Sequence, residues 1–203
     1  MYDDEFELTF DLSDEDKASR APALEQEPVQ EAAPEPAAET EPPVESVPEP
    51  AVPAANGRCV LISGGDRGIG AAAARAFWQA GYRVAVLYHT HAEAAAALEK
   101  ELPGLLAVQC DVASRASCEV AFHTVEQAVG HVDVLVSNAG IAQQKLFTDI
   151  TPEEWQHMLD VNLSGAFHLC QLALPGMIRR KAGRILTVSS MWGQTGGSCE
   201  VSP

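Results

Sequence analysis

From Arg58 onward, the chain alternates short apolar runs with segments of helical period, several of them rich in alanine. This alternation is typical of βαβ units, in which crossover helices connect parallel strands. The apolar runs predict strands at 59–63, 83–88, 105–110, 132–137 and 184–189. The segments between them predict helices at 68–80, 92–102 and 114–129, and a long helix that opens at Thr151 and continues towards Arg180.

The longest predicted helix carries clear start and stop signals. Thr151 stands at its N-cap, Pro152 at its first position, and Glu154 where it would close a capping box. Pro175-Gly176 should kink or break it near its end, because proline cannot donate the helical hydrogen bond. Together the elements predict an α/β fold, a doubly wound parallel sheet of strand order 3-2-1-4-5 with right-handed connections.

The first 57 residues differ sharply in composition from the rest. They hold sixteen Asp and Glu against only Lys17 and Arg20, a net charge of −14, and nine of the thirteen prolines. From about residue 18 this stretch is too poor in apolar side chains to offset the entropy of ordering. We therefore expect a disordered acidic arm rich in Pro, Glu and Ala at 1–57. The domain at 58–203 is nearly neutral, with 13 acids and 11 bases.

Charge and cysteine content exclude several kinds of protein. An overall charge of −16 argues against nucleic-acid or anionic-membrane binding, because both require a basic face. The acidic start is unlike a secretory signal, and no apolar run approaches ~18 residues, so we expect a cytoplasmic protein. The five cysteines include no C-x-x-C pair and have no histidine at metal-ligand spacing. They predict reduced, mostly buried thiols and no metal site.

A glycine-rich turn lies between the first predicted strand and the first predicted helix. It reads Ser63-Gly64-Gly65-Asp66-Arg67-Gly68-Ile69-Gly70. Such a turn lets the backbone reach a pyrophosphate and directs the helix N–H groups towards it. Its spacing is G-x-x-x-G-x-G rather than the G-x-G-x-x-G of ordinary dinucleotide folds. Glycines also serve tight packing, so the flanking strand and helix are what favour the cofactor interpretation.

This turn resembles the T-G-x-x-x-G-I-G motif of classical short-chain dehydrogenases/reductases, which have a Rossmann fold. Three further segments match in order: Asp111-Val112 resembles the family's adenine-contacting D-V, Asn138-Ala139-Gly140 its N-A-G, and Asn162-Leu163-Ser164-Gly165 its N-x-x-G. The resemblance covers 58–202. The cofactor-binding residues expected here are Gly64, Asp66, Arg67, Gly68, Ile69, Gly70, Tyr88, His89, Asp111, Val112, Asn138, Ala139 and Gly140.

The charges around the second strand favour NADP(H) over NAD(H). An NAD enzyme needs an acid at the end of that strand to bind the ribose hydroxyls and repel a 2′-phosphate. Here the sequence is Tyr88-His89-Thr90-His91, and Arg67 stands where NADP-dependent members carry a base. We expect Arg67 and His89 at the phosphate. An exposed polar loop explains both histidines equally well, so the prediction depends on Arg67.

The resemblance implies ketone reduction, in which nicotinamide donates a hydride, a serine orients the carbonyl and a tyrosine, assisted by a lysine, protonates the oxygen. Ser190 matches that serine, and Asn162 matches the asparagine of the catalytic tetrad. The family's tyrosine commonly follows thirteen residues after the serine, which is the position of Pro203, and the lysine would lie beyond it. We therefore expect the chain as written to lack the last strands and to be nearly inert.

Substrate and assembly can be predicted only coarsely. The segment 193–202 resembles the substrate loop of 3-oxoacyl-[acyl-carrier-protein] reductases, and 198–201 is similar to the branch that reduces the 5-aminopentanone group on elongation factor P. The substrate would then be a small-molecule, acyl-carrier or protein-bound ketone, and a homo-oligomer is expected only of the complete protein. A non-catalytic module that binds a dinucleotide or a partner remains the alternative.

Overall fold

A computed structural model describes residues 55–190 of the chain. Most of the expected arm, the predicted substrate loop at 193–202 and Pro203 lie outside the described residues. In the described part, Cys59, Cys110, Cys118 and Cys170 are free thiols, and the first three are buried. No helix between residues 55 and 190 has the length and apolar character needed to cross a membrane.

The central sheet has five parallel strands in the order β3-β2-β1-β4-β5, which confirms the predicted fold class. The strands are β1 (Cys59–Ser63), β2 (Arg83–Tyr88), β3 (Leu106–Gln109), β4 (Val134–Ser137) and β5 (Arg184–Thr187). β1 and β4 are buried along their whole length, whereas β5 is largely exposed.

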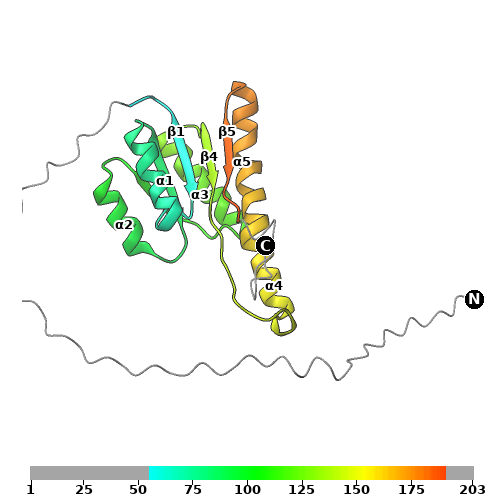
Figure 1. Cartoon of the computed structure of the whole chain (residues 1–203). Helices are drawn as coiled ribbons and strands as arrows, with labels where there is room; N and C mark the ends of the chain where they lie inside the picture. Colours follow the sequence, from blue (N-terminus) through cyan, green and yellow to red (C-terminus); the bar gives the residue numbers. More distant parts are fainter. Residues whose placement is uncertain (1–54, 191–203) are drawn as a thin grey trace, which may run out of the picture. The chain divides into compact units, whose positions relative to one another are not determined.

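Helices cover both faces of the sheet (Figure 1). They are α1 (Gly68–Gln79), α2 (Ala92–Glu101), α3 (Arg115–Val129), α4 (Pro152–Leu159) and α5 (Gly165–Arg180), with a short 3-10 helix, η2, at Phe147–Asp149. Side chains alternate across a strand, so Val60 and Ile62 pack under α1 and α2 while Leu61 packs under α3 and α5. The two cores hold the strand ends rigidly in place.

The long C-terminal helix begins as predicted but is interrupted at a different place. Thr151 accepts a hydrogen bond from the Glu154 N–H, and the Glu154 carboxylate accepts one from the Thr151 N–H, which completes the capping box. α5 runs through Pro175 without ending there, so a break at this proline, one of the two predicted effects, is wrong. Burial of Leu169, Ala173 and Met177 outweighs the single hydrogen bond lost at the exposed proline.

The actual irregularity lies earlier, in a π-helical turn, η3 (Asp160–Ser164), between α4 and α5. Such turns are rare and frequently stand at functional sites.

Two residues that the sequence assigns to the acidic arm are attached to the domain. The Asn56 backbone N–H donates to the Gly81 carbonyl, and its side-chain amide donates to the Ala80 carbonyl. Arg83 donates to the Gly57 carbonyl. These bonds fix the entry into β1, so contacts with the domain are already made before Arg58.

The packing of α5 against the sheet gives a stability prediction. Leu169→Ala should lower the free energy of unfolding by about 2–5 kcal/mol, because it leaves a cavity in the core, whereas Leu174→Ala should cost less than about 1 kcal/mol. Leu169 is fully buried, whereas Leu174 is 41% exposed on the same helix. Urea unfolding of the two variants would check this, and equal losses would contradict the packing described.

Candidate cofactor site

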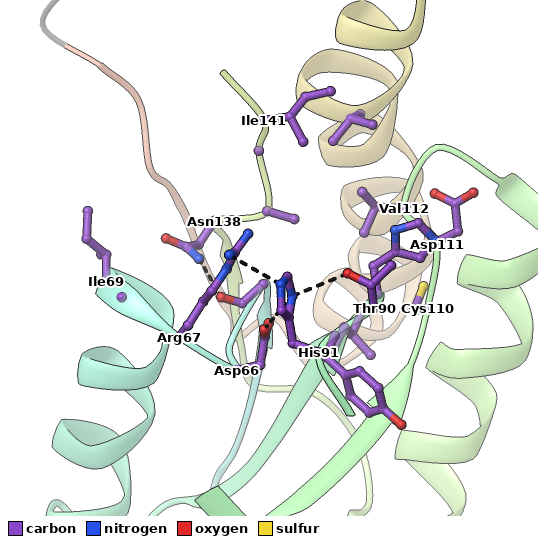
Figure 2. A pocket seen from close by; sticks show the side chains of 18 of the residues that line it. Asp66, Arg67, Ile69, Thr90, His91, Cys110, Asp111, Val112, Asn138 and Ile141 are labelled. Atoms are coloured by element: carbon purple, nitrogen blue, oxygen red, sulfur yellow. Dashed lines mark hydrogen bonds and ion pairs between the residues drawn. The ribbon is translucent and has the colours of Figure 1, made fainter. Parts of the chain in front are cut away.

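The carboxyl ends of β1, β2, β3 and β4 surround a hollow of about 430 Å³ (Figure 2). The sheet reverses its strand order between β1 and β4, and in such folds ligands bind at this reversal point. Of the cofactor residues expected from the sequence, all but Gly70 line the hollow. The lining also includes Leu87, Thr90, His91, Cys110, Ile141, His157 and Val161, which the sequence prediction did not name.

Gly70 instead allows helix α1 to pack closely against the turn that follows β1. A Cβ atom at Gly70 would lie 2.0 Å from the Gly64 carbonyl oxygen and 2.7 Å from the Asn138 side-chain nitrogen. Gly68 adopts φ +52°, and no heavy atom lies within 4 Å of the position that a Cβ would take there. The backbone at the start of α1 is therefore exposed to an entering group.

The start of α1 has no capping side chain. In contrast, Ser114 caps α3 and Thr151 caps α4. The first turn of α1 also contains no acidic residue. Its N–H groups and the positive end of its dipole are therefore suited to a phosphate.

Asn138, which also lines the hollow, ties β4 to the glycine turn. Its side-chain nitrogen donates to the carbonyls of Ser63, at 3.0 Å, and Gly64, at 2.9 Å. The Ser63 hydroxyl accepts hydrogen bonds from the N–H groups of Asn138 and Ala139, both at 3.0 Å. These four hydrogen bonds hold Asn138 and Ala139 beside the glycine turn, while the role of Asn138-Ala139-Gly140 beside a cofactor stays a prediction.

Asn162 lies in the π-helical turn and holds the loop after β4. Its side-chain oxygen accepts from the Ile141 N–H at 2.9 Å, and its nitrogen donates to the Ile141 carbonyl at 3.0 Å. Three residues later, a Cβ at Gly165 would approach Val112 to 2.9 Å, so only glycine lets α5 pack so closely there. The N-x-x-G segment thus positions two loops of the hollow at once.

Two predicted catalytic residues, Asn162 and Ser190, do not line the hollow. Asn162 acts on it through Ile141. Ser190 is exposed and follows β5, three residues beyond the last strand residue. It therefore lies on the carboxyl side of the sheet, as the resemblance requires of a serine that faces substrate.

A buried thiol pair supports the third strand end. The Cys118 thiol donates towards Cys110 Sγ, 3.9 Å away, and the Ser117 hydroxyl donates to the same sulfur at 3.7 Å. The bond from Cys118 lowers the pKa of Cys110, while the same interaction and burial raise the pKa of Cys118. Asp111 stays in place because its Oδ1 accepts from the Ala113 N–H at 3.0 Å.

The glycine turn faces the loop after β2, and there the side chains of Asp66, Arg67 and His91 meet (Figure 2). His91 Nε2 lies 3.4 Å from Arg67 Nη1, and His91 Nδ1 lies 3.5 Å from Asp66 Oδ2. The sequence prediction chose His89 for this place, but the structure brings His91 to Arg67. The direction in which each side chain of a loop points cannot be predicted from residue spacing. The sequence therefore contained no signal that distinguished His91 from His89.

The hollow fits a dinucleotide. It offers an uncapped helix start, backbone accessible at Gly68 and the side chain of Arg67. Its volume falls within the range of small-molecule sites, about 300–1,000 Å³. Among residues 55–190, no three His, Cys, Asp or Glu side chains gather so that they could hold a metal ion.

Comparison with known proteins gives concordant matches. The family model for short chain dehydrogenase matches residues 58–202. The chain is 40% identical over 137 residues to acetoacetyl-CoA reductase of Paracoccus denitrificans, covering 68% of this chain and 56% of that protein. It is 39% identical over 139 residues to the 3-oxoacyl-[acyl-carrier-protein] reductase MabA of Mycobacterium tuberculosis (strain H37Rv), covering 68% and 53%.

A solved structure is similar as well. The crystal structure of gox2181 superposes with a TM-score of 0.63 at 33% identity, and the match covers 68% of this chain and 55% of that one. The chain thus spans a little over half the length of the proteins it matches.

The hydrogen bonds of Asn138 give a second prediction. Asn138→Asp removes the donor and turns an oxygen towards two carbonyls, so it should lower the free energy of unfolding by about 1–3 kcal/mol and weaken nucleotide binding. Asn56→Asp is the matched control, because Asn56 also donates to a carbonyl but is exposed. Thermal melting and titration with a dinucleotide would compare them. Equal effects would show that Asn138 does not support the glycine turn.

Proposed function

This chain belongs to the short-chain dehydrogenase family, and on that premise we propose that it binds NADPH for the reduction of a ketone to an alcohol. The observation that carries the choice of NADPH is Arg67, which lies in the glycine turn and lines the hollow. No acid stands at the end of β2, where Tyr88 and His89 line the same hollow. An arginine there can bond a 2′-phosphate with charge assistance.

The parts of the hollow suit the parts of a dinucleotide. The uncapped start of α1 would receive the pyrophosphate, and Asp111 and Val112 would border the adenine. Ala139, Gly140 and Ile141 would flank the nicotinamide half, where Asn162 holds the loop in position. A bound nicotinamide supplies the hydride that the carbonyl carbon accepts.

The chain's own residues would orient the ketone. Ser190 would donate a hydrogen bond to the carbonyl oxygen, and Asn162 would keep the loop at Ile141 fixed while the oxygen takes up a proton. The resemblance assigns the proton donation to a tyrosine and a lysine of a Tyr-x-x-x-Lys segment. We therefore propose the activity for a protein in which residues 58–190 are combined with that segment.

The substrate class we favour is a 3-oxoacyl thioester. This choice rests on relatives named acetoacetyl-CoA reductase and 3-oxoacyl-[acyl-carrier-protein] reductase. The protein-bound ketone of elongation factor P stays a prediction, because 198–201 lie outside the described residues. A cytoplasmic location and a homo-oligomer of the complete protein likewise remain proposals.

Cofactor preference gives the third prediction. The chain should bind NADPH more tightly than NADH, and Arg67→Glu should cut that preference by about tenfold or more, since it removes a charge-assisted bond of roughly 1.5–3 kcal/mol. Arg179→Glu is the control, because it makes the same charge change on exposed α5 surface. Cofactor fluorescence titrations would measure both. Tighter binding of NADH by the unsubstituted chain would remove the argument.

Reductase activity gives the fourth prediction. A chimera that joins residues 1–190 to the remaining segment of the Paracoccus relative should oxidise NADPH in the presence of acetoacetyl-CoA. Ser190→Ala should lower its kcat by about 10²-fold or more, as expected when a group that stabilises developing charge is removed. A folded chimera that binds NADPH but turns over no ketone would instead support the non-catalytic module.

A further inference from the structure

A buried carboxylate lies beside the arginine expected to bind the phosphate. Asp66 is only 9% exposed, and its Oδ2 accepts no hydrogen bond from the residues that the structure describes. Asp66 and Arg67 are neighbours in sequence, yet within residues 55–190 they form no ion pair with each other. His91 is the group that lies next to both (Figure 2).

We propose that His91 is a specificity-determining residue that shields the Asp66 carboxylate and keeps Arg67 available to a 2′-phosphate. The inference rests on the proposed function, since it concerns the same dinucleotide site. Without His91, the negative charge of Asp66 would act on the hollow in two ways. It would repel a phosphate, or it would pair with Arg67 and neutralise it.

The contacts of the imidazole ring support this role. Nδ1 lies 3.5 Å from Asp66 Oδ2 and 3.3 Å from the Thr90 hydroxyl, while Nε2 lies 3.4 Å from Arg67 Nη1. Arginine only donates hydrogen bonds, so Nε2 accepts when the two are bonded, and the ring proton then sits on Nδ1 facing Asp66 and Thr90. One ring thus separates a carboxylate from a guanidinium and contacts both.

The position of His91 also allows it to meet a ligand. Its side chain is 47% exposed and lines the hollow, whereas the side chain of Asp66 is 6% exposed behind it. A phosphate that takes the donors of Arg67 releases Nε2 from that bond. Nε2 then faces the phosphate, while Nδ1 continues to face the carboxylate.

The test compares two small nucleotides that differ in the 2′-phosphate. Binding of adenosine 2′,5′-bisphosphate and adenosine 5′-monophosphate to the 203-residue chain is measured by calorimetry. The unsubstituted chain should prefer the bisphosphate, and His91→Ala should reduce the preference by on the order of tenfold. Asp66→Asn added to His91→Ala should restore most of the lost preference, because it removes the unshielded charge. His91→Gln provides a second variant if His91→Ala does not fold.

Two controls separate a local effect from a general one. His131→Gln removes another histidine that pairs with an aspartate, at 3.1 Å from Asp133, away from the hollow, and should leave the preference unchanged. Arg67→Ala should abolish the preference whether or not His91 takes part.

The outcomes are distinguishable. If Arg67→Ala abolishes the preference but His91→Ala does not change it, or if Asp66→Asn fails to restore it, the role of His91 is overturned and the proposed NADPH preference stands. If Arg67→Ala leaves the preference intact, or the unsubstituted chain binds neither nucleotide, the proposed function fails and this inference fails with it.

Discussion

The close approach of α1 to the turn after β1 is the constraint on which the hollow depends. At Gly70 the helix comes so near the Gly64 carbonyl that any side chain would collide with backbone. Backbone cannot move aside as a flexible side chain can, so a substituted turn would have to open. The same carbonyl accepts from Asn138, which links the turn to β4 across the reversal point of the sheet. The start of the helix and the end of two strands are therefore held as one unit.

A second set of contacts extends that unit to the other side of the hollow. The π-helical turn rotates Asn162 towards Ile141, and Gly165 brings α5 against Val112. Ile141 belongs to the loop after β4 and Val112 to the loop after β3, so the two contacts hold both loops beside the hollow. The irregular turn therefore stands where these loops are joined to the helices.

The sequence predicted the sheet order, the glycine turn and the capping box because each depends on local chemistry or on period. Thr151 and Glu154 need only their own turn to form the box, and they do. The sequence predicted a kink or break at Pro175, but α5 does not end there. The burial that stabilises α5 comes from tertiary packing, which local helix propensity does not include. The π-helical turn and the position of His91 between Asp66 and Arg67 could not be predicted either. Both depend on distances between segments that only the folded chain brings together.

The corner of the hollow formed by Asp66, Arg67 and His91 shows how specificity and stability are coupled. Arg67 and His91 are both substantially exposed, so substituting either of them alters the hollow without disturbing either hydrophobic core. Asp66 differs, because its carboxylate is buried and one of its oxygens lacks a hydrogen bond. Such an oxygen is destabilising by about 1–3 kcal/mol unless a donor or a positive charge is near. The His91 ring, whose Nδ1 lies 3.5 Å from that oxygen, offsets part of that cost. Under the proposed role of His91, a ligand at this corner would gain binding energy from satisfying a buried carboxylate as well as from new contacts. This distinguishes it from a site that is fully satisfied before the ligand arrives.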